Sequence, residues 1–339
     1  MTAPSTANHP AALLPTVPDP ARPRPEQRGR RFATPNPSAV HHSFFDALRW
    51  MMSRKPGPWP DAVDVQPAVP DERVQGDALR VTWVGHTTVL VQVAGVNLLT
   101  DPIWSDRCSP LSWAGPKRVA PPGVRFEDLP PIDVVVLSHD HYDHLDAPTV
   151  RRIVEAHAAC TFVAPVGVGR RLAAWGAAHV VEASWWDAVD VCGLRITCTP
   201  AQHFSGRTAF DRDTTLWATW MIEPAEGGAI WFGGDTGWFE GGFRAIGDAF
   251  DDVRLALIPI GAFEPRWFMS PVHIDPQQAV ELARIVGARH VLATHHRTFP
   301  LADDGYDQPA NELAACLDEA SEADGWFRVV AHGEAWDVA

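Results

Sequence analysis

The chain has 339 residues, a formal net charge of -14 at pH 7 and 46% hydrophobic residues, including 15 tryptophans. This composition is typical of a globular protein rather than a disordered one, and the acidic balance argues against nucleic acid as the main partner. No apolar run reaches the ~18 residues of a membrane-spanning helix, and the N-terminus lacks the basic and apolar regions of a secretion signal. The five cysteines show no CxxC spacing, which favours reduced structural thiols in a cytosolic protein.

The first part of the chain divides into a leader and a helix with a connector. Residues 1–40 are rich in Pro, Ala and Arg and show no periodicity, which predicts a flexible leader. Residues 41–72 contain a predicted amphipathic helix and a Pro-rich connector. The apolar stripe of this helix is formed by Phe44, Phe45, Leu48, Met51 and Met52. We expect this stripe to pack on the core of the protein, with contact to a membrane interface as the alternative.

Strands and helices alternate over residues 73–339. The first strands are predicted at 81–84, 88–93 and 96–100, and a later strand-rich stretch covers 179–235. The other predicted strands are 132–137, 161–164, 255–260, 290–294 and 327–330, and the predicted helices are 147–157, 166–175, 276–287 and 309–320. Strand-rich halves interleaved with helices predict an α/β fold, in which two sheets pack together with helices outside.

The most informative motif is His139-Asp140-His141-Tyr142-Asp143-His144, directly after an apolar strand. Side chains two apart in an extended chain point the same way, so His139 and His141 can bind one ion. Asp143 and His144 lie further on and can reach a second ion. Imidazole suits zinc, and a carboxylate can bridge or cap it. A polar surface loop is the alternative, but so many metal-competent residues after a strand favour a metal site.

Three more candidate ligands each follow an apolar or β-like run. They are His203, Asp235 and His295. A metal site built on loops needs ligands from distant strand ends, and these three complete a set for two ions that share Asp235. Taken singly, each has another explanation: a surface histidine, a turn carboxylate, or one member of the His295-His296 pair. The set is more specific than any of its members.

The ligand set resembles the metallo-β-lactamase superfamily, in which an HxHxDH loop, a later His, an Asp and a final His build a binuclear site. Further motifs resemble one branch, the N-acyl-phosphatidylethanolamine-hydrolysing phospholipases D. They are Trp83–Leu90, Thr100–Trp104, Gly115–Arg118, Gly234–Gly237, Glu264–Met269, His273–Pro276 and His332–Glu334. The resemblance covers roughly residues 31 to 337. It implies that residues 73–339 form one hydrolase domain with the metallo-β-lactamase fold, an αβ/βα sandwich of two mixed sheets with helices outside.

The resemblance also implies a ligand assignment for two zinc ions, with Mn or Fe as alternative metals. One ion takes His139, His141 and His203, and the other takes Asp143, His144 and His295. Asp235 bridges the two ions, and His296 is then a neighbour rather than a ligand.

The resemblance assigns roles to residues around the metals. His273, with Asp235, is expected to be catalytic, because the family places a histidine beside the substrate phosphate. Where the family has Gln before this histidine, the chain has Val272. We expect Asp140 to orient a metal-bound histidine, with a loop-capping carboxylate as the alternative.

A further group of residues is expected to contact the substrate. Lys117 and Arg118 would meet a phosphate, and Arg266, Trp267 and Phe268 would line an acyl groove. The alternatives are a solvated basic pair and aromatic residues of the core.

Together these features imply a binuclear zinc-dependent phosphodiesterase that hydrolyses N-acyl-phosphatidylethanolamine-like lipids to N-acylethanolamine and phosphatidate. The alternative is a lactonase or a hydrolase of small phosphodiesters or sugar phosphates in the same fold. A nuclease is disfavoured by the acidic balance, and a non-catalytic scaffold by the complete ligand set. We expect a phospholipid or small phosphodiester as substrate, no nucleic acid, and peripheral membrane contact without a transmembrane segment. A homodimer is compatible with the sequence, and the expected location is the cytoplasm, including the inner membrane surface.

Overall fold

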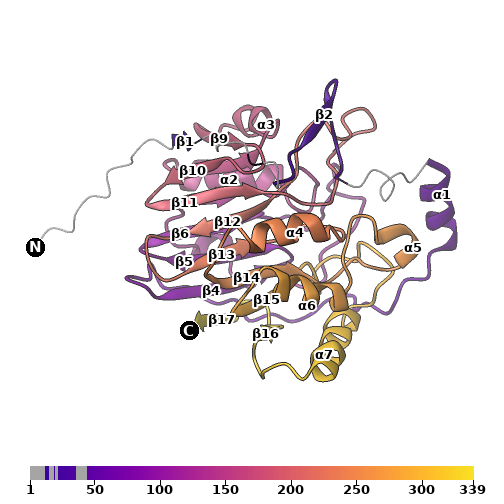
Figure 1. Cartoon of the computed structure of the whole chain (residues 1–339). Helices are drawn as coiled ribbons and strands as arrows, with labels where there is room; N and C mark the ends of the chain where they lie inside the picture. Colours follow the sequence, from indigo (N-terminus) through magenta and orange to yellow (C-terminus); the bar gives the residue numbers. More distant parts are fainter. Residues whose placement is uncertain (1–11, 15–18, 20–21, 36–43) are drawn as a thin grey trace, which may run out of the picture.

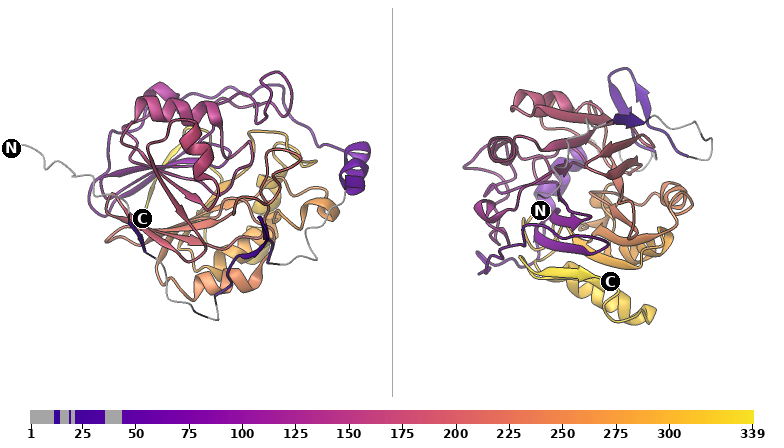
Figure 2. Two further views of the ribbon diagram at one scale, coloured as in Figure 1. Left: turned by 90° about the horizontal axis from the view of Figure 1, so that it is seen from above. Right: turned by 90° about the vertical axis from the view of Figure 1, so that its left-hand side faces the viewer.

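The computed structural model describes residues 12–14, 19, 22–35 and 44–339. The rest of the predicted leader, 1–40, lies outside the described residues. Two large mixed sheets pack face to face, and helices cover their outer faces (Figure 1). Figure 2 shows the magenta helices on one side of the sheets and the orange and yellow helices on the other. The predicted αβ/βα sandwich is therefore confirmed.

The first sheet has seven strands, and the loop with the candidate ligands 139–144 follows its fifth strand, β7. Its order is β17 (Ala335–Val338), β4 (Leu79–Gly85), β5 (Thr88–Val93), β6 (Val96–Thr100), β7 (Val134–Val136), β8 (Thr161–Pro165) and β9 (His179–Ala183). Pairing is antiparallel from β17 to β6 and parallel from β6 to β9. The prediction that a strand at 327–330 closes the fold was wrong, because β17 follows it and pairs with β4.

The second sheet has eight strands. Its order is β1 (Ala12–Leu14), β10 (Ala188–Val191), β11 (Leu194–Thr199), β12 (Thr219–Glu223), β13 (Ala229–Phe232), β14 (Val253–Pro259), β15 (His290–Thr294) and β16 (Phe327–Arg328). The strands from β13 to β16 are parallel. Strand β1 belongs to the predicted leader, as does a separate hairpin of β2 (Glu26–Arg28) and β3 (Arg31–Ala33). The described part of the leader thus contains regular structure that its composition did not predict.

The helices flank these sheets, and a 3-10 helix at Phe126–Asp128 lies in the connection from β6 to β7. They are α1 (Phe44–Ser53), α2 (Ala147–Ala156), α3 (Gly169–Ala174), α4 (Glu240–Gly247), α5 (Arg266–Met269), α6 (Pro276–Ile285) and α7 (Gln308–Ala320). Helices α4 and α5 were not predicted. Helix α6 starts where the sequence indicates, because the Asp275 side chain accepts a hydrogen bond from Gln278 N at 2.8 Å in a capping box. Within the described residues, no helix combines the length and apolarity needed to cross a membrane.

The core has two layers because side chains alternate across each strand. In β7, Val134 and Val136 point between the sheets, whereas Val135 points outward to the layer under α2 and α3. The inner layer also contains large aromatic side chains of the second sheet, among them Trp220 and its cross-strand partner Phe232. The strands that carry the ligand loops are buried on both faces and are therefore held rigidly.

Helix α1 packs through a residue that was not part of the predicted stripe. Trp50 stacks on Phe268 of α5 with ring centroids 4.8 Å apart, and Arg54 pairs with Asp303 at 2.8 Å. The described stripe residues face solvent, with 75% of Phe45 and 81% of Met52 exposed, while the side chain of Phe44 lies outside the described part. The expectation that the stripe packs on the core was wrong. The stacking of Trp50 on α5, the position of Arg49 over the Trp267 ring at 4.6 Å and the ion pair of Arg54 provide the attachment instead.

The outer core layer gives a test of the fold. Leu172 of α3 is fully buried in it. We expect Leu172→Ala to lower the free energy of unfolding by about 2–5 kcal/mol, because it removes buried methyl groups and leaves a cavity. Urea unfolding followed by circular dichroism measures this change. Leu111→Ala, at an exposed position, is the matched control with an expected change of about 0.5 kcal/mol or less. Equal losses in both variants would contradict the assigned core.

Candidate metal centre

The candidate ligands converge from segments that are far apart in sequence. The motif 139–144 follows β7, His203 follows β11, Asp235 follows β13 and His295 follows β15. The carboxyl ends of these strands meet at one edge of the sandwich, where loops from both sheets face each other. Metal-competent atoms of these residues lie within 4.8 Å of one another in overlapping groups.

The first group consists of three buried or half-buried imidazoles. His139 Nε2 lies 2.7 Å from His141 Nδ1, which lies 3.3 Å from His203 Nε2. Burial lowers the pKa of His141 to about 4 and that of His203 to about 3, and it lowers the pKa of His139 as well. All three rings are therefore neutral at pH 7 and have lone pairs for one ion.

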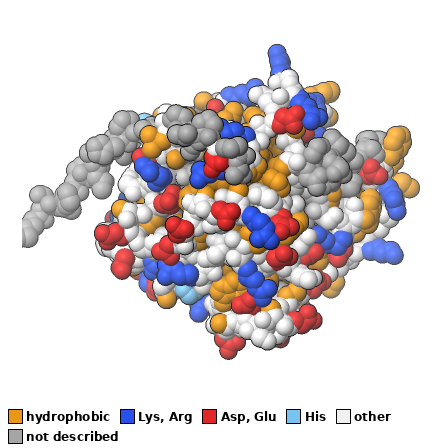
Figure 3. Space-filling view, viewed as in Figure 1, with side chains coloured by type: hydrophobic (Ala, Val, Ile, Leu, Met, Phe, Trp, Pro, Cys, Tyr) orange, Lys and Arg blue, Asp and Glu red, His pale blue; other side chains and the backbone are white. Residues whose placement is uncertain are grey.

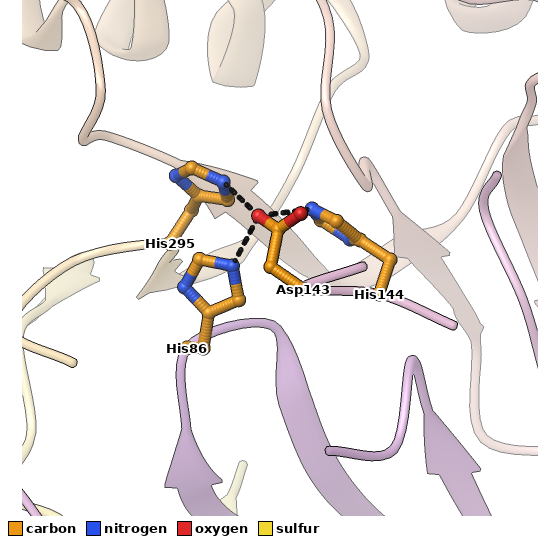
Figure 4. A group of neighbouring side chains, drawn as sticks. All are labelled: His86, Asp143, His144 and His295. Atoms are coloured by element: carbon orange, nitrogen blue, oxygen red, sulfur yellow. Dashed lines mark hydrogen bonds and ion pairs between the residues drawn. The ribbon is translucent and has the colours of Figure 1, made fainter. Parts of the chain in front are cut away.

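The second group gathers around a carboxylate (Figure 4). Asp143 Oδ2 lies 3.2 Å from His144 Nε2 and 3.5 Å from His295 Nε2. A fourth member, His86, approaches the same oxygen with its Nε2 at 2.9 Å. His86 was part of a quoted motif but had no predicted role. The sequence feature that could have indicated His86 is its position directly after β4, because the other candidate ligands also follow strands.

Asp235 lies between the two groups. Its Oδ2 is 3.1 Å from His144 Nε2, 3.2 Å from His295 Nε2 and 3.8 Å from His203 Nε2. The preceding Gly234 has φ 50, and a Cβ there would lie 2.5 Å from the Cβ of Ser138. Only glycine allows this approach, which brings the β13 loop against the start of the histidine motif.

Several buried nitrogen and oxygen atoms at the centre make no hydrogen bond with the described residues. They are His144 Nε2, Asp235 Oδ1, His273 Nδ1 and both ring nitrogens of His295. Buried polar atoms are nearly always paired, so a cluster of unpaired ones facing one space indicates a bound group. Imidazoles and carboxylates in this number suit divalent ions such as zinc. The residues present therefore fit a metal centre.

A buried carboxylate orients His144. Asp101 Oδ2 lies 2.6 Å from His144 Nδ1, and both side chains are fully buried. Asp101 also accepts a hydrogen bond from Ser138 N at 2.7 Å. Donation from Nδ1–H leaves Nε2 directed at Asp143 and Asp235, an arrangement that metal-binding histidines commonly use. Asp101, directly after β6, had no predicted role.

Asp140 acts on a loop. Its carboxylate accepts hydrogen bonds from Gly206 N at 2.8 Å and Arg171 Nε at 3.2 Å. It therefore fixes the loop that follows His203, which matches the loop-capping alternative more closely than the orientation of an imidazole.

His273 lies at the rim of the centre. Its Nδ1 is 3.9 Å from Asp235 Oδ2, and its ring centroid is 5.3 Å from that of His203. Burial lowers its pKa to about 3, so the ring is neutral at pH 7. Arg266 donates a hydrogen bond to the His273 carbonyl at 2.9 Å and fixes its backbone. The carbonyl of Val272 pairs with His203 Nδ1 at 2.9 Å, so this position orients a candidate ligand through its backbone.

The expected substrate-contact residues lie in different surroundings. Arg118 is buried and donates to the carbonyls of Ile103 and Ser105, so it fixes the backbone of the segment that follows β6. Lys117 and Trp267 are exposed. Phe268 is half-buried against Trp50 and Arg266 holds the His273 loop, as described above. His296 stacks on Trp83 with ring centroids 4.5 Å apart, whereas His295 faces the other candidate ligands.

The fold and site define a class of protein. The family model described as the Beta-lactamase superfamily domain matches residues 96–296. The chain belongs to this family and is a metal-dependent hydrolase with the metallo-β-lactamase fold.

The comparisons also identify particular relatives. Over 272 residues the chain is 40% identical to N-acyl-phosphatidylethanolamine-hydrolyzing phospholipase D 1 of Caenorhabditis elegans, covering 77% of this chain and 76% of that protein. It is 30% identical over 237 residues to the mitochondrial N-acyl-phosphatidylethanolamine-hydrolyzing phospholipase D of Saccharomyces cerevisiae, covering 68% of this chain and 50% of that protein. Among solved structures it is similar to Igni18, a metallo hydrolase from Ignicoccus hospitalis, with a TM-score of 0.58, 25% identity, and 77% and 99% of the two chains covered.

The charges of the metal-free centre predict how metal affinity depends on pH. Burial disfavours a proton on His295, but Asp235 and Asp143 outweigh burial and raise its pKa to about 9. The carboxylates likewise raise the pKa of His144 well above its ordinary value. Both rings therefore carry protons near neutral pH that a metal must displace, so zinc affinity should rise between pH 6 and pH 8 with release of protons.

Calorimetry in buffers of different ionisation enthalpy measures both quantities. His179→Gln, which changes an exposed histidine of β9, is the control and should leave the pH dependence unaltered. Zinc affinity that is constant with pH, with no proton release, would contradict this account of the centre.

Proposed function

We propose that this chain is a binuclear zinc-dependent phosphodiesterase that cleaves N-acyl-phosphatidylethanolamine-like phospholipids into N-acylethanolamine and phosphatidate. The observation that carries the substrate class is the 40% identity to the Caenorhabditis elegans relative over 77% of the chain. The two ligand groups on either side of Asp235 support a binuclear centre. His139, His141 and His203 would hold one ion, Asp143, His144 and His295 the other, and Asp235 would bridge them.

When bound, the two ions lower the pKa of water towards about 7 and withdraw charge from phosphoryl oxygens. The surroundings of Asp235 keep its carboxylate ionised, so that it can bind the ions. Burial opposes the charge on Asp235, but His144 and His295 hold its pKa well below the ordinary value. Asp235 thus supplies negative charge between the groups and, beside His273, faces the position of the reacting phosphate.

His273 is the residue we assign to the leaving group. Water adds its oxygen to phosphorus, the bond from phosphorus to the ethanolamine oxygen breaks, and that oxygen gains a proton. His273 is neutral and its Nδ1 has no hydrogen-bond partner among the described residues. A hydrogen on this nitrogen would stabilise the departing oxygen, while Arg266 keeps the backbone of His273 in place.

We also infer that α1 contacts the lipid surface that contains the substrate. Its exposed stripe lies at one end of the molecule, where hydrophobic atoms gather in Figure 3. The helix packs on α5, which ends at Met269 shortly before His273. Arg49 and Lys55 add positive charge to the same segment. An apolar face with basic neighbours is typical of helices that lie in a membrane interface.

Product analysis tests the reaction. Zinc-loaded protein in ¹⁸O-water is given N-acyl-phosphatidylethanolamine, and mass spectrometry follows both products. We expect N-acylethanolamine without label and phosphatidate with one labelled oxygen, because water attacks phosphorus. The double variant His141→Ala/Asp143→Ala, which removes one proposed ligand from each group, should form neither product.

No product from wild-type protein verified to hold two metals would contradict the lipid assignment. Hydrolysis of a lactone or a small phosphodiester would then favour the alternative substrates. Metal analysis that finds iron in the active protein would replace zinc in the proposal.

Vesicle sedimentation tests the proposed membrane contact. We expect Met51→Ser/Met52→Ser to reduce binding to vesicles of phosphatidylcholine and phosphatidylglycerol about tenfold or more, because burial of each methionine contributes about 1.5–3 kcal/mol. Val69→Ser, at another exposed apolar position, is the control. Hydrolysis of a water-soluble short-chain substrate should be unchanged. Unchanged vesicle binding would contradict the contact, and conversion of a dimer to a monomer in light scattering would show that the stripe serves a second copy of the chain.

A further inference from the structure

His86 occupies a backbone conformation that needs an explanation. It follows β4 directly and has φ 55, which is uncommon for a residue with a side chain. Three hydrogen bonds fix this conformation. His86 N donates to Thr298 Oγ1 at 2.8 Å, and His86 O accepts from Trp83 Nε1 at 2.9 Å and from His295 N at 3.0 Å. Strained conformations that the surroundings hold so firmly are frequent at functional sites.

The fixed backbone directs the His86 ring at a candidate metal ligand. Its Nε2 lies 2.9 Å from Asp143 Oδ2, and the side chain is buried (Figure 4). The ring packs against His295 with centroids 4.2 Å apart and against Phe299 with centroids 5.4 Å apart and the two ring planes nearly perpendicular. With its backbone fixed and two rings packed against its side chain, the His86 ring has little freedom to leave Asp143.

We propose that His86 is a positioning residue that holds Asp143 in the orientation needed to bind the second ion. The inference rests on the proposed binuclear centre. A carboxylate oxygen has two lone pairs, so Asp143 Oδ2 can accept a hydrogen from His86 and still bind a metal. A His86 ring that gives its Nε2–H to Asp143 has no lone pair on that nitrogen for the ion. His86 therefore acts through Asp143 and is not a further ligand.

This role also explains why two motifs outside the ligand set meet here. Gly333 N donates to Trp83 O at 2.8 Å, and Trp83 N donates to Glu334 O at 3.2 Å. His332 Nε2 lies 3.3 Å from the hydroxyl of Thr298, the group that holds His86 N. The segments 83–86 and 332–334 are thus hydrogen-bonded to each other, and together they fix the position of the His86 ring.

Two amide variants separate positioning from a structural role. His86→Gln keeps an N–H donor at about the reach of Nε2, whereas the amide of His86→Asn is one methylene shorter and falls short of Asp143. Asn tolerates a positive φ better than Gln. A purely structural role therefore predicts that His86→Asn is the better replacement, and positioning of Asp143 predicts the reverse.

The measurement is zinc stoichiometry under titration with a competing chelator, together with the unfolding temperature of each variant. We expect His86→Asn to keep one tightly bound zinc and to bind the second about 10–100-fold more weakly, the usual effect of losing a residue that orients a ligand. His86→Gln should keep most of the second-site affinity.

Wild-type affinity at both sites in His86→Asn would overturn the proposal, as would loss of the second ion in His86→Gln that equals the loss in His86→Asn. If His86→Gln does not fold, His86→Asn alone decides between one retained zinc and two. Wild-type protein that binds fewer than two metals would instead overturn the proposed binuclear centre, so the two failures are distinguishable.

Discussion

Charge balance in a buried space is the constraint on which the centre depends. Asp143 and Asp235 are removed from most solvent, and a buried carboxylate is costly unless cations or hydrogen bonds compensate it. In the metal-free protein His144 and His295 provide this compensation, because the carboxylates raise the pKa of both rings. Bound metal ions would compensate the same carboxylates. The order of this edge of the sandwich and its binding of metal therefore depend on the same few side chains.

The two sheets make such a concentration of charge possible. Each candidate ligand lies in a segment that follows a strand buried on both faces, so the rigid layers fix where these segments start. A second ring of residues then removes the remaining freedom. Asp101 orients an imidazole, Asp140 fixes the loop after His203, and Arg266 holds the backbone of His273. Many hydrolases share this fold, and these contacts fix the particular arrangement of imidazoles and carboxylates in this chain.

Most of the sheet framework and the convergence of the candidate ligands could be predicted, because both depend on local sequence patterns. Apolar runs predicted the strands, and metal-competent residues after them indicated the centre. Asp101 and His86 obey the same rule but were not singled out, since one such residue after one strand carries little weight. The attachment of α1 through Trp50 could not be predicted, because its partner Phe268 is remote in sequence. Strand β17 is short, and its pairing with β4 is equally remote.

The pairing of β17 with β4 has a consequence for how the chain reaches its native state. The strand that leads to His86 is near the start of the domain, yet the neighbour that covers its edge consists of residues 335–338. During synthesis the edge of β4 therefore stays open until residues 335–338 have been made and have paired with it. Open strand edges can pair with other chains, and contacts of such long sequence separation form slowly. Before β17 docks, newly made chains are therefore exposed to aggregation through the edge of β4.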